Sequence, residues 1–325
     1  MNVIVIGLGS MGKRRIRLIK QINSECHIVG VDKKKNRRDE VEQLFGIDTC
    51  ESLEVVLAQN CTCAFVCTSP LSHSSIINLC LKNNLHVFTE INLVDDGYNE
   101  NINLAKKKDL TLFLSSTFLY RDEVKYIQEE VKKSNSLLSY SYHIGQYLPD
   151  WHPWENYTDY FIGDARTSGC REIMAIDFPW LYQTFGPMKN VKVVKGKKTN
   201  LKTTYPDCYL MLIEHENGVQ GSVTVDVVSR KAIRNFEVYG EDLYLTWNGS
   251  VDGLIKYDIE KKIEKNINLY NQVDHQVGYA AFIVENAYRS EVEKFFDVVS
   301  GKSKSSYGFE EDKKVLDIIN RIEGE

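Results

Sequence analysis

Three glycines near the start of the chain have a spacing that suits binding of a pyrophosphate. Gly7, Gly9 and Gly12 follow the pattern G-x-G-x-x-G. The first glycine permits a tight turn, the second lets the backbone approach the pyrophosphate, and the third allows a helix to pack closely on a strand. The phosphates then lie at the helix N-terminus, where free N–H groups and the helix dipole favour negative charge. We expect Ser10 and Met11, which lie within the motif, to border the phosphates.

An acidic residue occurs where such a site needs a contact to the adenosine ribose. Asp32 directly follows the apolar run 27–31 and lies about 20 residues after the last glycine. Its carboxylate can accept a hydrogen bond from a free 2′-OH and repels a 2′-phosphate, which favours NAD over NADP. Lys33, Lys34 and Arg37 follow, and a cation can accommodate that phosphate, so NADP is the alternative cofactor.

Strands and helices that alternate would bring these groups to one edge of a parallel sheet. Helical stretches separate the apolar runs at 3–6, 27–31, 63–67, 86–89 and 111–115. This alternation predicts βαβ units and a doubly wound parallel sheet, an α/β Rossmann domain over residues 1–120. The turn 68–73 follows a buried strand at the edge where ligands bind.

The second part of the chain has a different pattern. Strand-like runs occur at 136–146, 191–194, 208–214, 219–228, 234–239, 242–247 and 253–258. Turns such as Asn217-Gly218 and Asn248-Gly249 are typical of hairpins. We therefore predict an α+β domain with a large, mostly antiparallel sheet over residues 121–325. Two closing helices, about 279–300 and 309–322, are expected to pack back near the first domain.

Composition limits the kinds of partner. The formal net charge of −5 argues against nucleic acid and anionic membranes, since neither would be attracted overall. The sequence has no apolar run long enough to span a membrane and no leader-like segment before the first strand, so we expect a cytoplasmic protein. The eight cysteines form no C-x-x-C pair, and we predict buried thiols and no metal site.

These features together resemble the Gfo/Idh/MocA oxidoreductase family. The resemblance rests on 7–12, Asp32, Thr68-Ser-Pro-Leu-Ser-His73, His86-Val-Phe-Thr-Glu90 and the hairpin-rich second sheet. Family members mostly oxidise or reduce sugars and cyclitols. The resemblance implies that NAD(P) lies across the first domain and that substrate lies between the nicotinamide and the second sheet. It also implies a homodimer or homotetramer formed through the open face of that sheet. The further cofactor contacts that it implies are Thr68, Ser69, Pro70, His73 and Glu90.

Two departures from the family pattern concern proton transfer. The family's Glu-Lys-Pro reads Glu90-Ile91-Asn92 here, so Ile91 replaces the catalytic lysine. The family's helix aspartate and histidine fall on Glu172 and Ile176, and a shift of one residue would bring Asp177 into the site instead. Isoleucine has no titratable proton, so the usual proton donors are absent.

Replacements are expected in and around the segment 142–157, which is rich in aromatic and titratable residues. If this segment has no role in the site, it is instead a packing loop or a subunit contact. His143 could likewise be a core histidine instead of a proton carrier, and Arg171 could form a structural ion pair with Glu172 instead of a substrate contact. We predict these proton carriers: His143, His152, Tyr157 and, assisting, Glu172. We predict these substrate contacts: Tyr120, Trp151, Trp154, Glu155, Arg166, Arg171 and Asp177.

The function expected from this reading is hydride transfer between a nicotinamide and a hydroxyl or keto carbon of a sugar. The sugar is expected to be free or activated, either nucleotide-linked or acidic, as in the biosynthesis of surface polysaccharides. The lost proton donors leave two alternatives. One is a catalytically silent NAD(H)-binding relative with a sensing or scaffolding role. The other is an epimerase or lyase in which tightly bound NAD is reduced and reoxidised within one turnover.

Overall fold

The computed structural model describes residues 1–57, 60–151, 155–274 and 283–324. The chain forms two compact units, each assembled from two stretches of sequence. Unit 1 comprises Met1–Ser116 and Tyr288–Lys314, and unit 2 comprises Thr117–Ala287 and Val315–Glu325.

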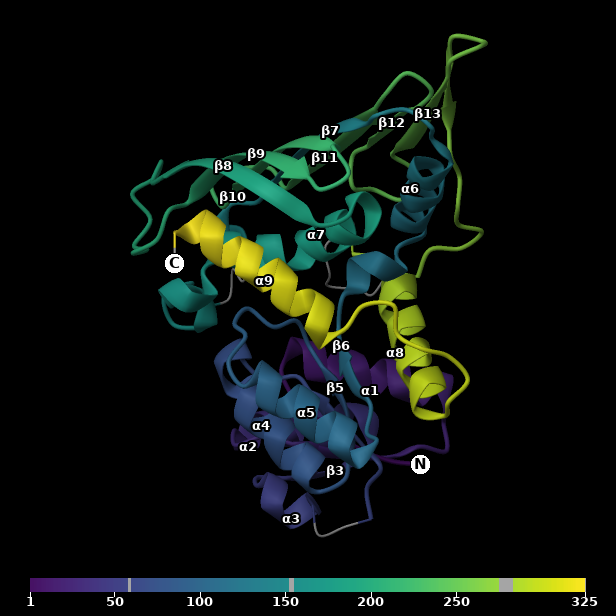
Figure 1. Ribbon diagram of the computed structural model, residues 1–325. Coiled ribbons are helices and arrows are strands. Elements are labelled where there is room, and N and C mark those ends of the chain that lie inside the picture. Colours follow the sequence, from purple (N-terminus) through teal and green to yellow (C-terminus); the bar gives the residue numbers. More distant parts are fainter. Residues whose placement is uncertain (58–59, 152–154, 275–282, 325) are drawn as a thin grey trace. The chain divides into compact units, whose positions relative to one another are not determined.

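Unit 1 is built on a parallel sheet whose described strands run in the order β3-β2-β1-β4-β5-β6. Figure 1 labels β3, β5 and β6 of this sheet. This is the order of a doubly wound dinucleotide-binding fold. The strands are β1 (Asn2–Ile6), β2 (His27–Val31), β3 (Asp48–Cys50), β4 (Cys63–Val66), β5 (His86–Thr89) and β6 (Leu112–Leu114). The helices between them are α1 (Ser10–Ile22), α2 (Lys35–Phe45), α3 (Leu53–Leu57), α4 (His73–Lys82) and α5 (Tyr98–Lys108), with the short 3-10 turn η1 (Pro70–Ser72) before α4.

Aromatic residues hold helix α8 (Glu285–Val299) against this sheet. Phe65 on β4 and Phe88 on β5 stack with ring centroids 4.8 Å apart. The ring of Phe295 on α8 packs edge-on against both of these rings and also against the ring of Phe113 on β6. Edge-to-face pairs of this kind are the preferred geometry of buried aromatic rings. The C-terminal part of the chain therefore completes the core of unit 1.

Unit 2 is built on a second sheet whose described strands run in the order β14-β13-β12-β11-β7-β10-β9-β8. Neighbours are antiparallel except β7 and β10. The strands are β7 (Ser139–Gly145), β8 (Met188–Gly196), β9 (Cys208–His215), β10 (Gln220–Asp226), β11 (Ile233–Tyr239), β12 (Tyr244–Trp247), β13 (Leu254–Asp258) and β14 (Ile263–Asn266). The unit also contains α6 (Asp122–Lys133), α7 (Gly169–Phe185), the C-terminal part of α9 (Phe309–Glu323), and the 3-10 turns η2 (Thr117–Tyr120), η3 (Leu148–Asp150), η4 (Phe161–Gly163) and η5 (Ala165–Thr167).

Alternation along β7 gives this sheet a covered face and an open face. Tyr140 and Tyr142 are buried, and their rings pack on Phe185 and Trp180 of α7, respectively. The intervening Ser141 and His143 are less buried, because successive side chains of a strand point to opposite faces. We call the side that carries Ser141 and His143 the open face.

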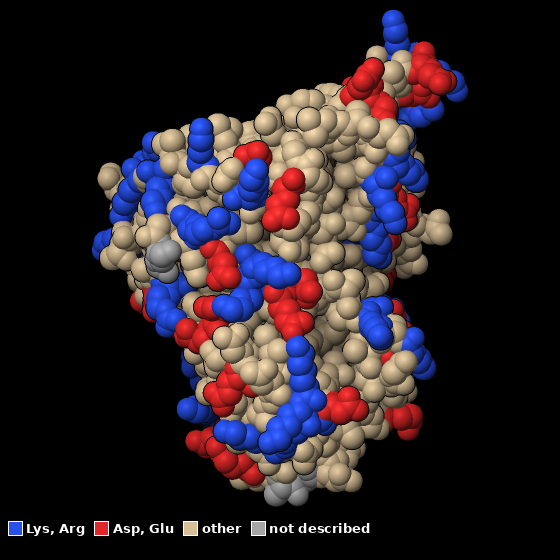
Figure 2. All heavy atoms as spheres, viewed as in Figure 1, with Lys and Arg blue, Asp and Glu red and all other residues tan. Residues whose placement is uncertain are grey.

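The predicted fold class, a Rossmann domain followed by an α+β domain with a mostly antiparallel sheet, is confirmed. Two strands, β3 and β14, add to those expected from the sequence. No helix in the described ranges is long and apolar enough to cross a bilayer. On the face shown in Figure 2, basic and acidic side chains are interspersed.

Candidate functional site

The glycine-rich loop after β1 tolerates side chains at only one of its three glycines. Gly7 has φ = +90°, and a Cβ on it would lie 2.6 Å from the carbonyl oxygen of Cys67. A Cβ on Gly12 would lie 1.9 Å from the carbonyl oxygen of Gly7. At Gly9, by contrast, the atom nearest to an added Cβ would be Nη1 of Arg37, at 3.8 Å. The fold therefore requires Gly7 and Gly12, while the space beside Gly9 fits an approaching pyrophosphate.

Helix α1 begins beside that space. It begins at Ser10 with Gly9 as its N-cap, and among the described residues no side chain caps it and no acid lies in its first turn. Ser10 is exposed, and Met11 accepts a hydrogen bond from Arg14 through its sulfur. The first N–H groups of α1 thus face a place where an anion is favoured.

Asp32, at the end of β2, is fixed beside the same loop. Its Oδ2 accepts from the backbone N–H of Leu8 at 2.9 Å, and its Oδ1 accepts from the N–H of Lys34 at 2.8 Å. Nη1 of Arg37 lies 3.5 Å from Oδ2. Lys33 is exposed. This position of a carboxylate fits a ribose hydroxyl, and Arg37 is the cation that accompanies it.

The turn after β4 is held by His73, the first residue of α4. The ring is buried, with Nδ1 2.7 Å from Oδ1 of Asn92 and Nε2 2.9 Å from the carbonyl oxygen of Thr68. Burial lowers the pKa of His73, which favours a neutral ring. Both ring nitrogens are therefore engaged in shaping the segment that carries Thr68, Ser69 and Pro70, of which Pro70 is buried and Ser69 exposed.

Glu90 belongs to a buried ion cluster that the sequence did not predict. Arg15 on α1 donates to Oε1 of Glu90 at 2.6 Å and to Oε2 at 3.0 Å. Arg15 also donates to Glu291 of α8 at 2.8 Å and to the Ser115 hydroxyl at 3.1 Å. Burial raises the pKa of Glu291. The cluster ties the helix of the glycine loop to β5 and α8.

The two residues after Glu90 differ in exposure. Ile91 is half-buried, whereas Asn92 is buried against His73. The position of the family's lysine is thus partly accessible and carries no titratable group.

In unit 2, Glu172 lies in the first turn of α7 and is half-buried. Burial raises the pKa of Glu172 to about 7. Its carboxyl has no hydrogen-bond or ion-pair partner within the part of the chain that the structure describes. Ile176, one turn further along α7, is also half-buried. A carboxyl whose pKa lies near neutrality can act as a general acid or base.

Asp177, the other candidate on this helix, points into the core. It is fully buried and accepts from the Tyr142 hydroxyl at 2.6 Å. Arg234 on β11 donates to it at 2.8 Å. This environment is that of a structural ion pair.

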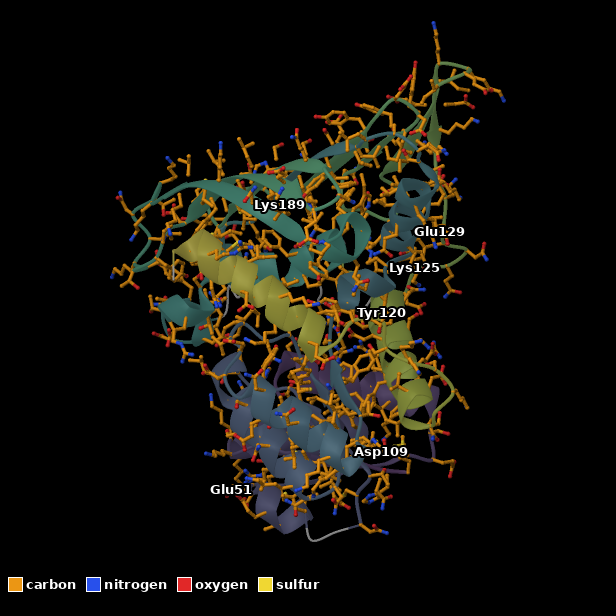
Figure 3. The ribbon with its side chains drawn as sticks, in the orientation of Figure 1. Glu51, Asp109, Tyr120, Lys125, Glu129 and Lys189 are labelled. Atoms are coloured by element: carbon orange, nitrogen blue, oxygen red, sulfur yellow. The ribbon has the colours of Figure 1, made fainter. Side chains whose placement is uncertain are left out.

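The arginines proposed as substrate contacts differ in environment. Arg171 is buried and donates to Glu323 and, at 2.6 Å, to Asn320, both on α9, so it does not pair with Glu172. Arg166 is exposed on η5. Tyr120 is half-buried at the end of η2, the turn that precedes α6 with its labelled Lys125 and Glu129 (Figure 3).

His143 projects from the open face of the sheet. Its Nε2 lies 2.7 Å from Oδ2 of Asp226, and its side chain is 38% exposed. Asp226 is fixed in turn by the backbone N–H groups of Val228 and Ser229. Because α7 covers the other face, the structure does not bring His143 and Glu172 together.

The aromatic segment is described only in part. Trp151 is half-buried, and its ring lies 3.6 Å from the Cβ position of Gly169, at the start of α7. The Tyr157 hydroxyl accepts from the backbone N–H of Lys202 at 2.9 Å, and Glu155 is exposed. His152 and Trp154 lie outside the described residues. Within the described ranges, no group of three or more His, Cys, Asp or Glu could hold a metal ion.

Comparison with known sequences gives a family match for the first domain. Residues 1–115 match the family model GFO_IDH_MocA, described as an oxidoreductase family with an NAD-binding Rossmann fold. A similar curated protein is the myo-inositol 2-dehydrogenase of Thermotoga maritima, 28% identical over 138 residues. That alignment covers 41% of this chain and 41% of the relative. The predicted cofactor class, NAD(P), agrees with this family.

Comparison with solved structures supports the fold of the whole chain. A levoglucosan dehydrogenase in complex with NADH matches with a TM-score of 0.83 and 14% identity, covering 99% of this chain and 95% of the other. The UDP-N-acetylglucosamine 3-dehydrogenase of Acidithiobacillus ferrooxidans matches with a TM-score of 0.78 and 14% identity, covering 99% and 96%. At this identity the likeness shows a shared fold.

Proposed function

We propose that the chain, whose residues 1–115 match the Gfo/Idh/MocA oxidoreductase family model, is an NAD-dependent sugar dehydrogenase or reductase. The reaction is hydride transfer between the nicotinamide and a hydroxyl or keto carbon of a sugar, free or activated. The names of its relatives support this substrate class, since they act on an inositol, an anhydrosugar and a nucleotide-linked amino sugar.

The observation that carries the proposal is the paired geometry of Gly9 and Asp32. The space beside Gly9 suits the pyrophosphate, and the carboxylate of Asp32 is fixed by two backbone N–H groups next to it. Packing does not require a glycine at position 9, because an added Cβ there would have no close contact. When bound, the nicotinamide supplies or accepts the hydride.

We assign the proton transfer to Glu172. Its carboxyl is half-buried and titrates near neutrality, and one turn of helix separates it from Ile176. In the direction of oxidation, an ionised Glu172 takes the proton of the substrate hydroxyl, and in reduction the protonated form returns it. Trp151, near the start of the same helix, offers an aromatic face for the sugar ring. His152, Tyr157, Trp154, Glu155, Arg166 and Tyr120 remain predicted contacts.

A silent NAD(H)-binding relative is the second candidate, and the two isoleucines favour it. The predicted alignment has Ile91 and Ile176 at the positions of the family's lysine and histidine, and both side chains are partly accessible. Internal redox, in which bound NAD is reduced and reoxidised within one turnover, needs the same proton carrier as net redox.

A thermal-unfolding scan with nucleotide-stripped protein tests the cofactor site. A ligand at about 100 times its Kd adds roughly 2.7 kcal/mol to stability, which raises Tm by several degrees. We expect a shift with NADH that exceeds the shift with NADPH, and then turnover of sugars followed by the absorbance of the reduced nicotinamide. A shift without turnover of any sugar supports the silent relative, and no shift with either nucleotide overturns the proposal. Turnover of a sugar without net change in nicotinamide indicates internal redox.

We further propose that the open face forms a homodimer or homotetramer interface. Val194, Leu210 and Leu212 on β8 and β9 are 69%, 47% and 63% exposed, which is unusual for adjacent apolar side chains on a monomer. Small polar residues such as Ser141 and Ser222 continue the face on β7 and β10. We expect Leu212→Glu to lower the mass measured by light scattering, whereas an unchanged mass would argue against this face.

A further inference from the structure

Asn92 places an amide where the family pattern has a proline. The family's Glu-Lys-Pro reads Glu90-Ile91-Asn92 here, and a proline side chain can neither donate nor accept a hydrogen bond. Asn92 is 2% exposed, and one end of its amide lies 2.7 Å from Nδ1 of His73. The nitrogen at the other end is buried and makes no hydrogen bond within the described part of the chain. A buried N–H group in this state requires an explanation.

His73 needs a donor, and not an acceptor, at its Nδ1. Nε2 of the ring lies 2.9 Å from the carbonyl oxygen of Thr68, which can only accept, so Nε2 carries a proton. Burial lowers the pKa of His73, which favours a neutral ring. Glu90 is the acid whose charge acts on this ring, and it is already paired with Arg15. A neutral ring has one N–H group, so its Nδ1 presents a lone pair.

The amide of Asn92 is able to supply that donor. The Thr89 hydroxyl lies 3.4 Å from Nδ1 of His73, but it donates at 3.2 Å to the carbonyl oxygen of Glu90. The two ends of an asparagine amide have nearly the same shape, so hydrogen bonding decides which end faces the ring. With its NH₂ group toward Nδ1, Asn92 donates to the lone pair, and its nitrogen is no longer without a partner.

Tyr98 can satisfy the other end of the amide. Asn92 acts on the Tyr98 hydroxyl, and both residues line the same small pocket as His73. The Tyr98 hydroxyl donates to Asp312 at 2.6 Å, and Tyr307 is a second donor to this carboxyl at 2.8 Å. Burial raises the pKa of Asp312 to about 6. A protonated Asp312 can donate to the Tyr98 oxygen, which leaves the proton of the Tyr98 hydroxyl for the amide oxygen of Asn92.

From this arrangement we propose that Asn92 is a positioning residue of the cofactor turn, which we define as residues 68–72. Its amide holds the ring of His73 neutral with the proton on Nε2, where that proton fixes the carbonyl group of Thr68. The turn is thereby ordered before the cofactor binds, which lowers the entropic cost of binding. The inference rests on the proposed function, because it takes this turn to contact NAD. The form of the His73 ring does not depend on that function.

Nitrogen-15 NMR of the histidine rings at pH 6, without nucleotide, tests the form of His73. A ring nitrogen that carries a proton resonates far from one that does not, and couplings to the ring C–H protons tell the two nitrogens apart. The chain has seven histidines, and the signals lost in His73→Gln identify this ring. If that variant does not fold, through-bond correlations from the backbone assign the ring. We expect a protonated Nε2 and an unprotonated Nδ1 in the wild type.

Two substitutions to aspartate show whether Asn92 determines this form. Asn92→Asp places a carboxylate beside Nδ1 and should draw a second proton onto the ring, so that both nitrogens of His73 become protonated. Asn101 is another buried asparagine of the same pocket, but it hydrogen-bonds Ser74 and Asn78. Asn101→Asp is therefore the charge control and should leave the His73 signals unchanged.

Titrations with NADH test whether the ring positions the cofactor turn. Asn92→Leu leaves Nδ1 without its donor, so we expect the Kd for NADH to rise about tenfold. Asn92→Asp still holds the ring through Nδ1 and should stay within about threefold of the wild type, as should the control Asn101→Leu. Unfolding scans without nucleotide establish that each variant folds. If Asn92→Leu does not fold, Asn92→Ala is titrated in its place.

A wild-type ring with both nitrogens protonated, or with its proton on Nδ1, would overturn the inference. An unchanged Kd for NADH in folded Asn92→Leu, or equal losses in the two leucine variants, would overturn it as well. Wild-type protein that does not bind NADH would instead sink the proposed function, while the form of His73 measured by NMR would still stand. The two failures are therefore distinguishable.

Discussion

Arg15 and Glu90 are joined by two hydrogen bonds, from Nε to Oε1 at 2.6 Å and from Nη2 to Oε2 at 3.0 Å. Arg15 lies three residues after the last glycine of the cofactor loop, and Glu90 follows β5. Glu291 of α8 accepts a hydrogen bond from the same guanidinium, so the one buried cation of Arg15 forms ion pairs with two buried carboxylates. The glycine loop is thereby anchored to the sheet by charge as well as by packing.

Replacing Arg15 by Met should destabilise the protein by about 3–5 kcal/mol, since it leaves two buried carboxylates without their cation. Denaturant unfolding measures this loss. Lys13→Ala, which removes the exposed ion pair with Glu40, is the control and should cost about 1 kcal/mol or less. Equal losses in the two variants would show that the buried cluster contributes no more than a surface pair.

The cluster also shows which parts of the site the sequence could reveal. The glycine motif and Asp32 are local patterns in which a strand, a turn and a helix follow one another, so they were recognisable. Arg15, Glu90 and Glu291 come from segments far apart in the chain, and no short-range pattern indicates that they meet. Such contacts become visible only once the topology is known.

The same distinction applies to the strands. Buried strands such as β1 and β4 are continuous apolar runs, which the sequence shows directly. Strand β3 has three residues and includes an acid, and every residue of β14 is exposed, so neither has an apolar run or an alternating pattern to detect. On α7 the sequence leaves two registers open, one with Glu172 and one with Asp177 in the site, and of these two residues Asp177 is the buried one.

The glycines of the loop give a matched pair of variants. Gly9→Ala should fold normally, because its Cβ meets nothing closer than 3.8 Å, but its methyl group should occupy the space for the pyrophosphate. We expect an unchanged Tm without nucleotide and loss of the shift with NADH. Gly12→Ala should lower Tm even without nucleotide, because its Cβ would collide with the Gly7 carbonyl. A full NADH shift in Gly9→Ala would contradict the assigned pyrophosphate site.

Asp32 and Arg37 should have opposite effects on cofactor choice. Asp32→Asn removes the charge that repels a 2′-phosphate, so we expect NADH to bind about tenfold more weakly and NADPH more tightly. Arg37→Gln removes the cation 3.5 Å from Asp32 and should weaken NADPH more than NADH. Titrations of nucleotide fluorescence give the four dissociation constants. Parallel changes for both nucleotides in either variant would mean that the residue does not contact the ribose.

The pKa of Glu172 predicts how activity depends on pH. Burial raises this pKa to about 7, so the carboxyl is mostly protonated below that pH and ionised above it. As the base for oxidation, Glu172 must be ionised, and kcat/KM for a sugar hydroxyl should rise through pH 7. The reverse reduction needs the protonated form of Glu172, so its kcat/KM should fall over the same pH range. Glu172→Gln should lower kcat by about 10²–10⁴-fold and remove this limb from both profiles.

The stability of the folded protein should change with pH in the opposite direction to kcat/KM for oxidation. Because the folded pKa of Glu172 lies above its unfolded value of 4.5, its contribution to stability is fully present below pH 4.5 and is lost as pH rises through 7. Glu172→Gln, which cannot ionise, should therefore gain stability relative to the wild type above pH 7 and match it more closely at pH 5. If the variant lost stability at both pH values equally, the carboxyl would be a structural group, and the proton carrier would have to be sought elsewhere.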